Sequence, residues 1–559
     1  MKHRFDGILA SNFLPFAVVA ALAILSACNP GPKYSRPPAP APTAYKEAPP
    51  QFKEGTGWVV AQPGDDKIRP KWWEMYNDPQ LNALEEQVAI SNQTVIQAEA
   101  NFRAARALVV EARSQLFPTI GGTGSYIRQH FSTNTRAATV TPTGGATTSA
   151  VSSTINQYSV AADVSYTLDL WHRVRNQIAA NSASAQASAA DVATALLTTR
   201  AELAQDYFEI RALDVQEGIL QDTLKNYGDN LKLTQILFKT GIDSDQDVTQ
   251  AQTQLDTATA QATDLGVARA QYEHAIATLI GKPAATFELP VAPFVPKPPP
   301  VPVGVPSELL QRRPDIAAAE RTVASANALI GYARGAYYPS VSLSASGGFL
   351  SSAISNWFTW PSRVWSLGPT ASDTLLDFGA RRGAVEQAEA TYDADVASYR
   401  QTVLSDFQTV EDNLASLRIL ATEVDQYETA VQASAHYLAL AMTRYRTGVD
   451  SYLNVITAQN TLLSNRETQV QVQLRQMTSS VGLIMALGGG WDVSQLPQYQ
   501  QFLKHPPKWS PAGAPPGAQP TTIAAPNPPV VPALPLPGSE AQPSPFGPPS
   551  GSKNPPQTK

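Results

Sequence analysis

The chain has little cysteine, no excess of basic residues and few histidines. Its 559 residues include a single cysteine, Cys28, so no disulfide can form within the chain. Its 41 Lys and Arg are outnumbered by 47 Asp and Glu, and a net charge of -6 gives no basic footprint for nucleic acid. The 6 His are scattered, and no phosphate-binding glycine loop or nucleophile motif occurs. We therefore expect no nucleic-acid partner, no metal, no cofactor and no enzymatic activity.

Long apolar runs are also missing after the N-terminus. No later window has the roughly 20 consecutive apolar residues that a membrane-spanning helix needs. A mature chain that crosses a bilayer must therefore do so with strands. Residues 1–27, in contrast, combine a short basic start, an interrupted apolar run and small residues at the end, which is typical of a signal peptide.

The end of this signal, Leu-Ser-Ala-Cys at 25–28, resembles the lipobox of bacterial lipoproteins. The resemblance implies that the signal is cut before Cys28 and that its thiol is acylated, which anchors the chain in lipid. Asn29 follows in place of the Asp that often signals inner-membrane retention, so the resemblance points to the outer membrane. The alternative is a plain secreted protein with an incidental cysteine.

The remainder divides by composition into two ordered blocks and three Pro-rich segments. Residues 28–70 are an extended, lipidated N-terminal extension, and 290–306 form a Pro-rich connector. Residues 505–559 are a Pro-rich tail that we expect to be disordered. The two blocks between them are 71–289 and 307–504.

The two blocks are internal repeats of each other. "RSQLFPTI" in the first block matches "RGAYYPSV" in the second, and "LDLWHR" matches "LDFGAR". The turn "FKTGIDSDQDV" at 238–248 likewise matches "YRTGVDSYLNV" at 445–455. Each block therefore predicts the same order of elements: a helix, two strands, a very long helix, a tight turn and a returning helix.

The predicted helices have lengths that match one another. The first helices span about 81–116 and about 307–337 and end before a proline. The long helices span about 171–238 and about 379–445, which is roughly 100 Å at 1.5 Å per residue. A first helix and a returning helix together are about as long as one long helix, so both can pair along it end to end.

Four segments per chain have strand character. Residues 158–170 and 341–349 alternate between apolar side chains and Ser, Thr or Asp, while 119–128 and 364–376 alternate less regularly. The stretch near 131–156 reads as a surface loop. An apolar and a polar face suit a barrel with lipid outside and water inside, but four strands cannot close one. Several chains must therefore share a barrel, and three chains would give twelve strands.

Four motifs carry a resemblance to a known family. They are "LLQRRPDI" at 309–316, Tyr-Pro-Ser at 338–340, Leu-Asp-Phe-Gly at 376–379 and "YRTGVDSYLNVITAQ" at 445–459. Together they resemble the outer-membrane factor lipoproteins of RND-type multidrug efflux systems, relatives of TolC. The resemblance implies a mostly α fold with two repeats, in which a homotrimer builds a long α-helical barrel and a shared transmembrane β-barrel with four strands per chain.

The same resemblance implies a function. The chain would be the exit duct of a tripartite pump, anchored in outer-membrane lipid and extending into the periplasm. Its partners would be a periplasmic adaptor and an inner-membrane RND-type transporter, and it would perform no chemistry. Two alternatives stay open: an outer-membrane channel for type I protein secretion, and a coiled-coil lipoprotein scaffold without a pore.

The resemblance also places a gate at the two turns, at the periplasmic end of the duct. Its hydrophobic constriction falls on Leu453. The Tyr and Arg that tie neighbouring helices fall on Tyr445 and Arg446, and their acidic partner in the first repeat falls on Asp247. Three copies of each side chain would form rings, and a leucine ring can close a pore by dewetting.

Two further acids, Asp243 and Asp450, would add charge near this mouth. The pairs Asp243-Ser244 and Asp450-Ser451 follow a glycine and precede a helix, so we favour helix capping over gating for both pairs. Asp247 suits a helix dipole as well as a gate, and Leu453 resembles an ordinary leucine of a helix seam. Thr457 stands where many relatives have a ring-forming Asp, which puts a second acidic constriction in doubt.

Overall fold

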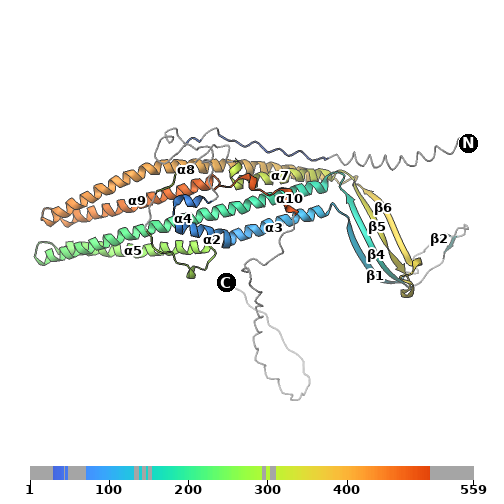
Figure 1. Ribbon diagram of the computed structural model, residues 1–559, viewed down its shortest axis with the longest axis horizontal. Helices are drawn as coiled ribbons and strands as arrows, with labels where there is room; N and C mark the ends of the chain where they lie inside the picture. Colours follow the sequence, from blue (N-terminus) through green and yellow to red (C-terminus); the bar gives the residue numbers. More distant parts are fainter. Residues whose placement is uncertain are drawn as a thin grey trace, which may run out of the picture. The chain divides into compact units, whose positions relative to one another are not determined.

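The fold of the chain comes from a computed structural model (Figure 1). The expected signal peptide, Cys28, most of the extension up to residue 70 and the Pro-rich tail from 505 lie outside the described residues. Parts of the connector and of the expected loop near 131–156 do so as well. The structure describes residues 29–42, 45–47, 71–130, 138–140, 146–148, 154–292, 297–301 and 310–503.

Two helices of 67 residues dominate the fold, α4 (Arg173–Lys239) and α8 (Ala380–Arg446). Each spans about 100 Å at 1.5 Å per residue, which confirms the expected long helices. After a tight turn the chain returns through helices of 35 residues, α5 (Asp245–Leu279) and α9 (Tyr452–Ala486). The two repeats therefore have the same arrangement of long and returning helix.

The first helix of repeat one is interrupted, contrary to the single helix expected over 81–116. The structure has α2 (Pro79–Ser91) and α3 (Gln93–Ser114), which are separated at Asn92. Asn92 has extended backbone angles, and its side-chain oxygen accepts the backbone N–H of Val95. Asn92 thus ends one helix and caps the next. Asn is favoured at such a position because its short side chain reaches the free N–H groups at the start of a helix.

The corresponding helix of repeat two, α7 (Pro314–Gly335), begins later than the expected residue 307. Pro314 occupies its first turn, and Arg313 before it is extended, with φ -97° and ψ 123°. The ring of a proline disfavours helical angles in the residue before it, so the helical residues 310–312 cannot run into α7.

The two repeats join their short and returning helices by the same contact. Asn92 Nδ2 donates to the carbonyl of Leu279 at 2.7 Å, and Arg313 Nη1 donates to the carbonyl of Ala486 at 3.1 Å. In each case a side chain at the start of the short helix binds a free carbonyl at the end of the returning helix. The short and returning helices therefore meet end to end beside one long helix.

A glycine is required at each of these junctions. Gly281 and Gly488 have φ of +67° and +90°, in the left-handed region that favours glycine. A Cβ on Gly281 would lie 2.2 Å from the carbonyl oxygen of Ser91, and one on Gly488 would lie 2.1 Å from that of Arg312. No side chain can be added there without moving backbone.

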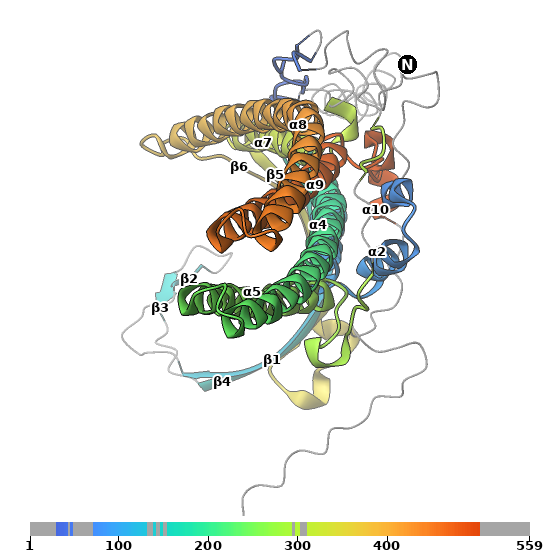
Figure 2. The ribbon, with the colours of Figure 1, turned by 90° about the vertical axis from the view of Figure 1, so that its left-hand side faces the viewer.

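The helices form one curved layer. Next to the strands the lateral order is α3, α4, α7, α8, and towards the turns it is α5, α4, α9, α8. Figure 2 shows α5, α4, α9 and α8 along an arc, with α2 and α10 on its convex side. The remaining short helices are η2 (Trp72–Tyr76), η3 (Ala284–Thr286), η4 (Ile354–Asn356), η5 (Trp360–Ser362), η6 (Val493–Gln495) and α10 (Tyr499–Phe502).

The main core lies where η2 and α2 pack against α4. Trp72 and Trp73 are almost fully buried and meet edge to face at 5.8 Å between ring centroids. The Arg200 guanidinium lies 4.4 Å from the Trp73 ring, and the Tyr207 hydroxyl donates to Asp78 at 2.5 Å. Aromatic packing and these polar contacts hold the middle of the long helix in place.

Four strands form an antiparallel sheet in the order β1 (Thr119–His130), β4 (Thr154–Leu168), β5 (Ser340–Ser351) and β6 (Arg363–Ser372). This confirms four long strands, two from each repeat. The strand expected to reach 376 ends earlier, because Asp373 turns away to pair with Arg381 at 3.5 Å. The expected loop near 131–156 contains a separate two-stranded sheet, β2 (Ala138–Val140) with β3 (Ala146–Thr148).

The register of the sheet gathers apolar residues on one face and polar residues on the other. Val164 of β4 pairs with Ile120 of β1 and Ala345 of β5. The next residue along the chain towards the N-terminus, Asp163, pairs with a glycine of β1 and a serine of β5. Since side chains alternate along strands, these rows define an apolar face and a Ser/Thr/Gly-rich polar face.

Candidate functional site: the two helix turns and the bare sheet

The turn of the first repeat is a stop followed by a capped restart. Gly241 has φ +78°, which lets the chain reverse after α4. Ser244 then caps α5: its hydroxyl accepts the N–H of Asp247 at 3.3 Å, and the Asp247 carboxylate accepts the Ser244 N–H at 3.2 Å. Asp247 is therefore held in a capping box, at the positive end of the α5 dipole.

The turn of the second repeat keeps the reversal but not the capping box. Gly448 has φ +72°, and Ser451 starts α9 without a side-chain cap. The residue that corresponds to Asp247 is Asn454, which offers no carboxylate to the preceding N–H. Two nearly identical turns thus differ in how firmly the returning helix is started.

Of the two Asp-Ser pairs expected to cap helices, only the first does so, through Ser244, whereas Ser451 makes no side-chain cap and neither Asp243 nor Asp450 caps a helix. Asp243 accepts a hydrogen bond from the Tyr445 hydroxyl, and Asp450 accepts one from Arg444 Nε at 2.5 Å. Each carboxylate precedes the serine that begins the helix, so it lies one residue too early to reach the free N–H groups. The hydrogen bond to Asp450 raises the pKa of the Arg444 guanidinium.

Tyr445 links the two repeats, but through a different acid than expected. Its partner in this chain is Asp243, whereas Asp247 is held by Ser244. Tyr445 is only 5% exposed and packs against Tyr452 at 5.3 Å between ring centroids. Burial, and then the hydrogen bond to Asp243, raise the pKa of Tyr445, so its hydroxyl remains a donor at neutral pH.

Leu453 and Arg446 remain on the surface of the chain. Leu453 is 57% exposed and, with Ile456, borders a groove of about 560 Å³ whose other wall is the start of α5. Arg446 is exposed and makes no side-chain hydrogen bond or ion pair with any described residue. The structure therefore brings Tyr445 to Asp243. Within one chain, however, Leu453 forms no constriction and Arg446 has no acidic partner among the described residues.

Sequence reasoning missed Arg444 and Tyr452. Arg444 stands where the first repeat has Leu237, so a comparison of the two copies could have marked it as a new charge facing Asp450. Tyr452, at the corresponding place to Asp245, is buried under Tyr445. Both differences lie in the second repeat, which makes its turn the more specialised of the two.

The apolar face of the sheet is bare. Ile120, Trp365 and Leu367 are between two thirds and four fifths exposed on it. Such a continuous apolar surface is typical of a face that contacts lipid or another protein. No helix among the described residues is long and apolar enough to cross a membrane.

Aromatic side chains gather at the end of this face that lies away from the helices. At the end away from the helices the rings of Tyr126, Tyr158, Trp357 and Phe358 follow one another at 4.8, 5.6 and 4.8 Å between centroids. At the helix end Trp171 stacks on Tyr338 at 4.7 Å and donates to the carbonyl of Pro339, but these two rings line a hollow together with Thr119 and Ser165 of the polar face. An aromatic cluster at the border of an apolar band is a feature of membrane-spanning strands.

The sequence matches the outer membrane efflux protein family over residues 84–282 and 305–489, one segment in each repeat. The chain belongs to this family. It is 32% identical over 489 residues to the probable efflux pump outer membrane protein TtgC of Pseudomonas putida, covering 86% of this chain and 96% of TtgC. It is accordingly an efflux protein of the outer membrane, as the sequence motifs predicted.

Solved structures agree with this membership. The outer-membrane channel OprN is 28% identical with a TM-score of 0.73, and the match covers 83% of this chain and all of OprN. The open state of the MtrE outer membrane channel of Neisseria gonorrhoeae is 26% identical with a TM-score of 0.70, over 83% of this chain and 99% of MtrE. The mostly helical fold with two repeats and a four-stranded sheet is thus that of outer-membrane channels.

Proposed function

We propose that this outer membrane efflux protein is the exit duct of a tripartite pump, a passive channel for small molecules that performs no chemistry. The observation that carries the proposal is the sheet, which, within the part of the chain that the structure describes, has one exposed apolar face, one polar face and two unpaired edges. Unpaired edges are not tolerated in hydrocarbon, so a membrane-spanning sheet of this kind must be completed by further copies.

The edges of the strands and helices support closure into a ring. β1 and β6 are the edge strands of the sheet. α3 leads into β1 and α8 follows β6. The helical layer likewise has α3 and α5 at one edge and α8 at the other. A contact of the β6/α8 edge with the β1/α3 edge of a second copy is head to tail, and such contacts generate rings. Three copies give twelve strands, so the assembly we propose is a homotrimer.

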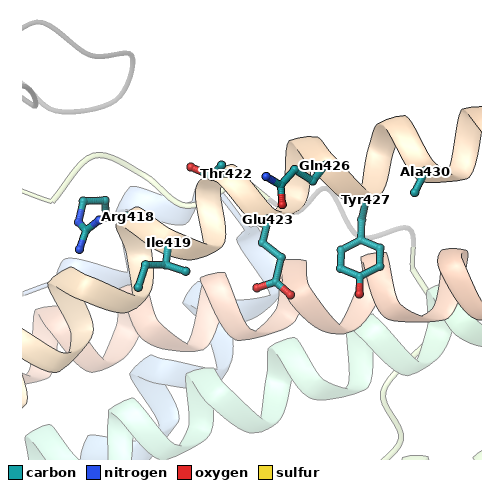
Figure 3. Close-up of a pocket in the computed structure, with 7 residues that line it drawn as sticks. All are labelled: Arg418, Ile419, Thr422, Glu423, Gln426, Tyr427 and Ala430. Carbon is teal, nitrogen blue, oxygen red and sulfur yellow. The ribbon is translucent and has the colours of Figure 1, made fainter.

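The exposed edge of α8 has the character of an interface without its partner. Figure 3 shows a hollow of about 700 Å³ that is lined by α8 alone. Glu423 and Tyr427 point to the same side of the helix, and Ile419 beside them is 54% exposed. Because this hollow has α8 on one side only, an exposed apolar side chain and a tyrosine in it are suited to contact a helix of a neighbouring copy.

The faces of the sheet set the direction of the ring. With the apolar face outward, the aromatic cluster at the end away from the helices meets a membrane interface and the apolar band beside it meets acyl chains. The polar face then lines the conduit. Substrate specificity need not reside in such a wall, and the similarity to TtgC, a probable efflux pump outer membrane protein, favours efflux over protein secretion.

The gate that we propose lies between copies at the two turns. Leu453 would meet its equivalents and close the pore by dewetting, and Arg446 would reach an acid of a neighbouring copy, with Asp247 the candidate. The Tyr445–Asp243 hydrogen bond holds the two turns of one chain together. Asp450 is paired with Arg444, so it adds no free carboxylate beside the leucine, and Thr457 carries only a hydroxyl, which donates to the carbonyl of Leu453.

Engagement of a periplasmic adaptor and an inner-membrane transporter would open this gate, which places both partners at the turns. Anchoring through Cys28 is also part of the proposal. The described chain begins at Asn29, whose side chain accepts a hydrogen bond from Asn176 at 3.1 Å. Asn176 is one turn from the start of α4, next to the sheet, so a lipid on the preceding residue would reach the membrane.

Planar-bilayer recording of the purified protein, together with native mass spectrometry, tests the proposal. We expect a trimer and stepwise current that rises when Leu453 is replaced by Ser. Absence of current from both the wild-type protein and Leu453→Ser would refute the duct. A stable monomer in a lipid bilayer would refute ring closure.

A further inference from the structure

Two hollows adjoin at the junction between the sheet and the helices. The first, of about 470 Å³, lies between α7 and α8, and the second, of about 410 Å³, lies between the start of α4 and the strand ends. Arg173 and Tyr332 line both hollows. Volumes of this size are those of pockets for drug-sized molecules.

The first hollow is lined by small and apolar side chains. Its walls belong to facing helices, and alanines on both sides leave room that larger residues would fill. Among the described residues that line it, the acidic or basic groups are Arg173 and Arg381. The apolar lining consists of Ala326, Leu329, Ala333, Ala336, Ala384 and Ala388.

The two arginines at the rim differ in charge compensation. Arg381 is paired with Asp377 at 2.5 Å, so its charge is already balanced. Arg173 donates to the Tyr332 hydroxyl at 3.1 Å and lies 4.6 Å from the Tyr332 ring, and no described carboxylate forms an ion pair with it. Asp169 of the second hollow instead accepts the N–H groups of Val174 and Arg175. An uncompensated cation thus borders an apolar cavity.

The hollows open on the polar side of the sheet. Thr119, Ser165 and Thr167, all on the polar face, line the second hollow. The opposite side of α7 is occupied by the N-terminal segment: Gly31 packs on Gly331, and the carbonyl of Pro32 accepts a hydrogen bond from Asn327.

At 3.6 residues per turn, Gly331 and Asn327 lie on the reverse face of α7 from Leu329 and Ala333, which line the first hollow. In Figure 2 the N-terminal segment, in dark blue, lies outside the arc of long helices. The first hollow therefore faces the concave side.

We propose that these hollows bind an exported amphiphilic anion, a drug-sized molecule with an aromatic or aliphatic body and a carboxylate or sulfonate. The body occupies the alanine-lined hollow, and the anionic group accepts hydrogen bonds from Arg173 and Tyr332. That the ligand is cargo rests on the proposed duct, because only then is the polar side the wall of the conduit. The duct thereby holds one class of solute briefly below the membrane instead of conducting all solutes alike.

Equilibrium dialysis of 8-anilinonaphthalene-1-sulfonate against the full-length protein in lipid nanodiscs tests the site, with empty nanodiscs subtracted. We expect saturable binding that weakens at least tenfold in Arg173→Gln, since a hydrogen bond to a charged group is lost. Ala384→Leu, which fills the hollow, should weaken it similarly. Arg175→Gln and Ala390→Leu are matched controls on the same helices that do not line the hollows, and both should bind like the wild type.

Each other outcome overturns the proposal. Binding that does not saturate, or that falls equally in variants and controls, excludes the site. If Arg173→Gln weakens binding of the uncharged dye N-phenyl-1-naphthylamine as much as binding of 8-anilinonaphthalene-1-sulfonate, Arg173 does not recognise the anionic group. An anionic phospholipid could copurify with the wild type in stoichiometric amounts and be lost only in Arg173→Gln. That result would assign the hollows to lipid instead of cargo. Bilayer conductance of the same samples reports separately on the duct itself.

Discussion

The hydroxyl of Tyr445, at the end of the second long helix, donates a hydrogen bond to Asp243, in the turn that follows the first. This bond joins the two repeats at the end of the chain where both long helices reverse. Because Tyr445 is buried and its partner is a carboxylate, the bond belongs to the stronger class, worth about 1.5–3 kcal/mol.

Loss of this bond should loosen the gate. We expect Tyr445→Phe to raise single-channel conductance and to sensitise cells to vancomycin, because the two turns of each chain can then separate. Tyr437→Phe is the control, since Tyr437 is a partly exposed tyrosine of the same helix. Equal conductance of Tyr445→Phe and wild type would show that the bond does not hold the gate.

Replacement of Leu453 should open the pore without unfolding the turn. Leu453 is exposed, so Leu453→Ser removes no buried packing within the chain. We expect higher conductance and entry of vancomycin-sized solutes. Val449→Ser alters an equally exposed apolar residue of the same turn and should have the smaller effect. If both variants leak alike, the constriction is not at Leu453.

The glycines of the second repeat should respond unequally to alanine. Gly488 and Gly448 both have positive φ, so both substitutions carry backbone strain of about 1 kcal/mol. Only Gly488→Ala also places a Cβ 2.1 Å from the carbonyl oxygen of Arg312, whereas Gly448 has open space. We expect thermal denaturation to give a distinctly lower Tm for Gly488→Ala than for Gly448→Ala. Equal Tm values would contradict the close contact at the helix junction.

The stability of the folded chain should depend on Asp206. Burial, and then repulsion by Glu202 and Glu209, raise the pKa of Asp206 from 3.8 to about 7. Between these values the folded protein holds a proton that the unfolded chain has released, so stability falls as pH rises through this window.

We therefore expect Asp206→Asn to raise Tm at pH 8 and to leave it nearly unchanged at about pH 4, where Asp206 is protonated in the folded state. Asp222→Asn changes an exposed acid of the same helix and serves as the control. The same Tm difference between Asp206→Asn and wild type at both pH values would show that burial does not set this titration.

A charge on the free edge of α8 should prevent assembly. Ile419→Glu places a carboxylate in the hollow where we expect a neighbouring copy. Ala421→Glu, on the other side of the same helix, adds the same charge away from this face. Native mass spectrometry should give trimers for Ala421→Glu and fewer trimers for Ile419→Glu. Trimers in equal amounts would remove α8 from the interface.

Much of the fold followed from local patterns. Absence of proline over about 171–238 and about 379–445 predicted two long helices, because nothing there interrupts the backbone hydrogen bonds, and the structure has them over Arg173–Lys239 and Ala380–Arg446. Alternation over 158–170 predicted a strand, since only one face of a two-sided sheet is apolar. The break at Asn92 was missed. The Asn92 amide donates to the carbonyl of Leu279, at the end of α5, and this contact with a distant helix is not visible in the local sequence pattern.

The sequence by itself determined that the chain has two copies of one unit, the lengths of its helices, its strands and its turns. All of these depend on residues close together in the sequence. The tertiary structure alone decided that Tyr445 pairs with Asp243 and that Arg173 borders an apolar hollow. Those relations join side chains from different helices, whose rotation and spacing depend on packing along the whole length of α4 and α8.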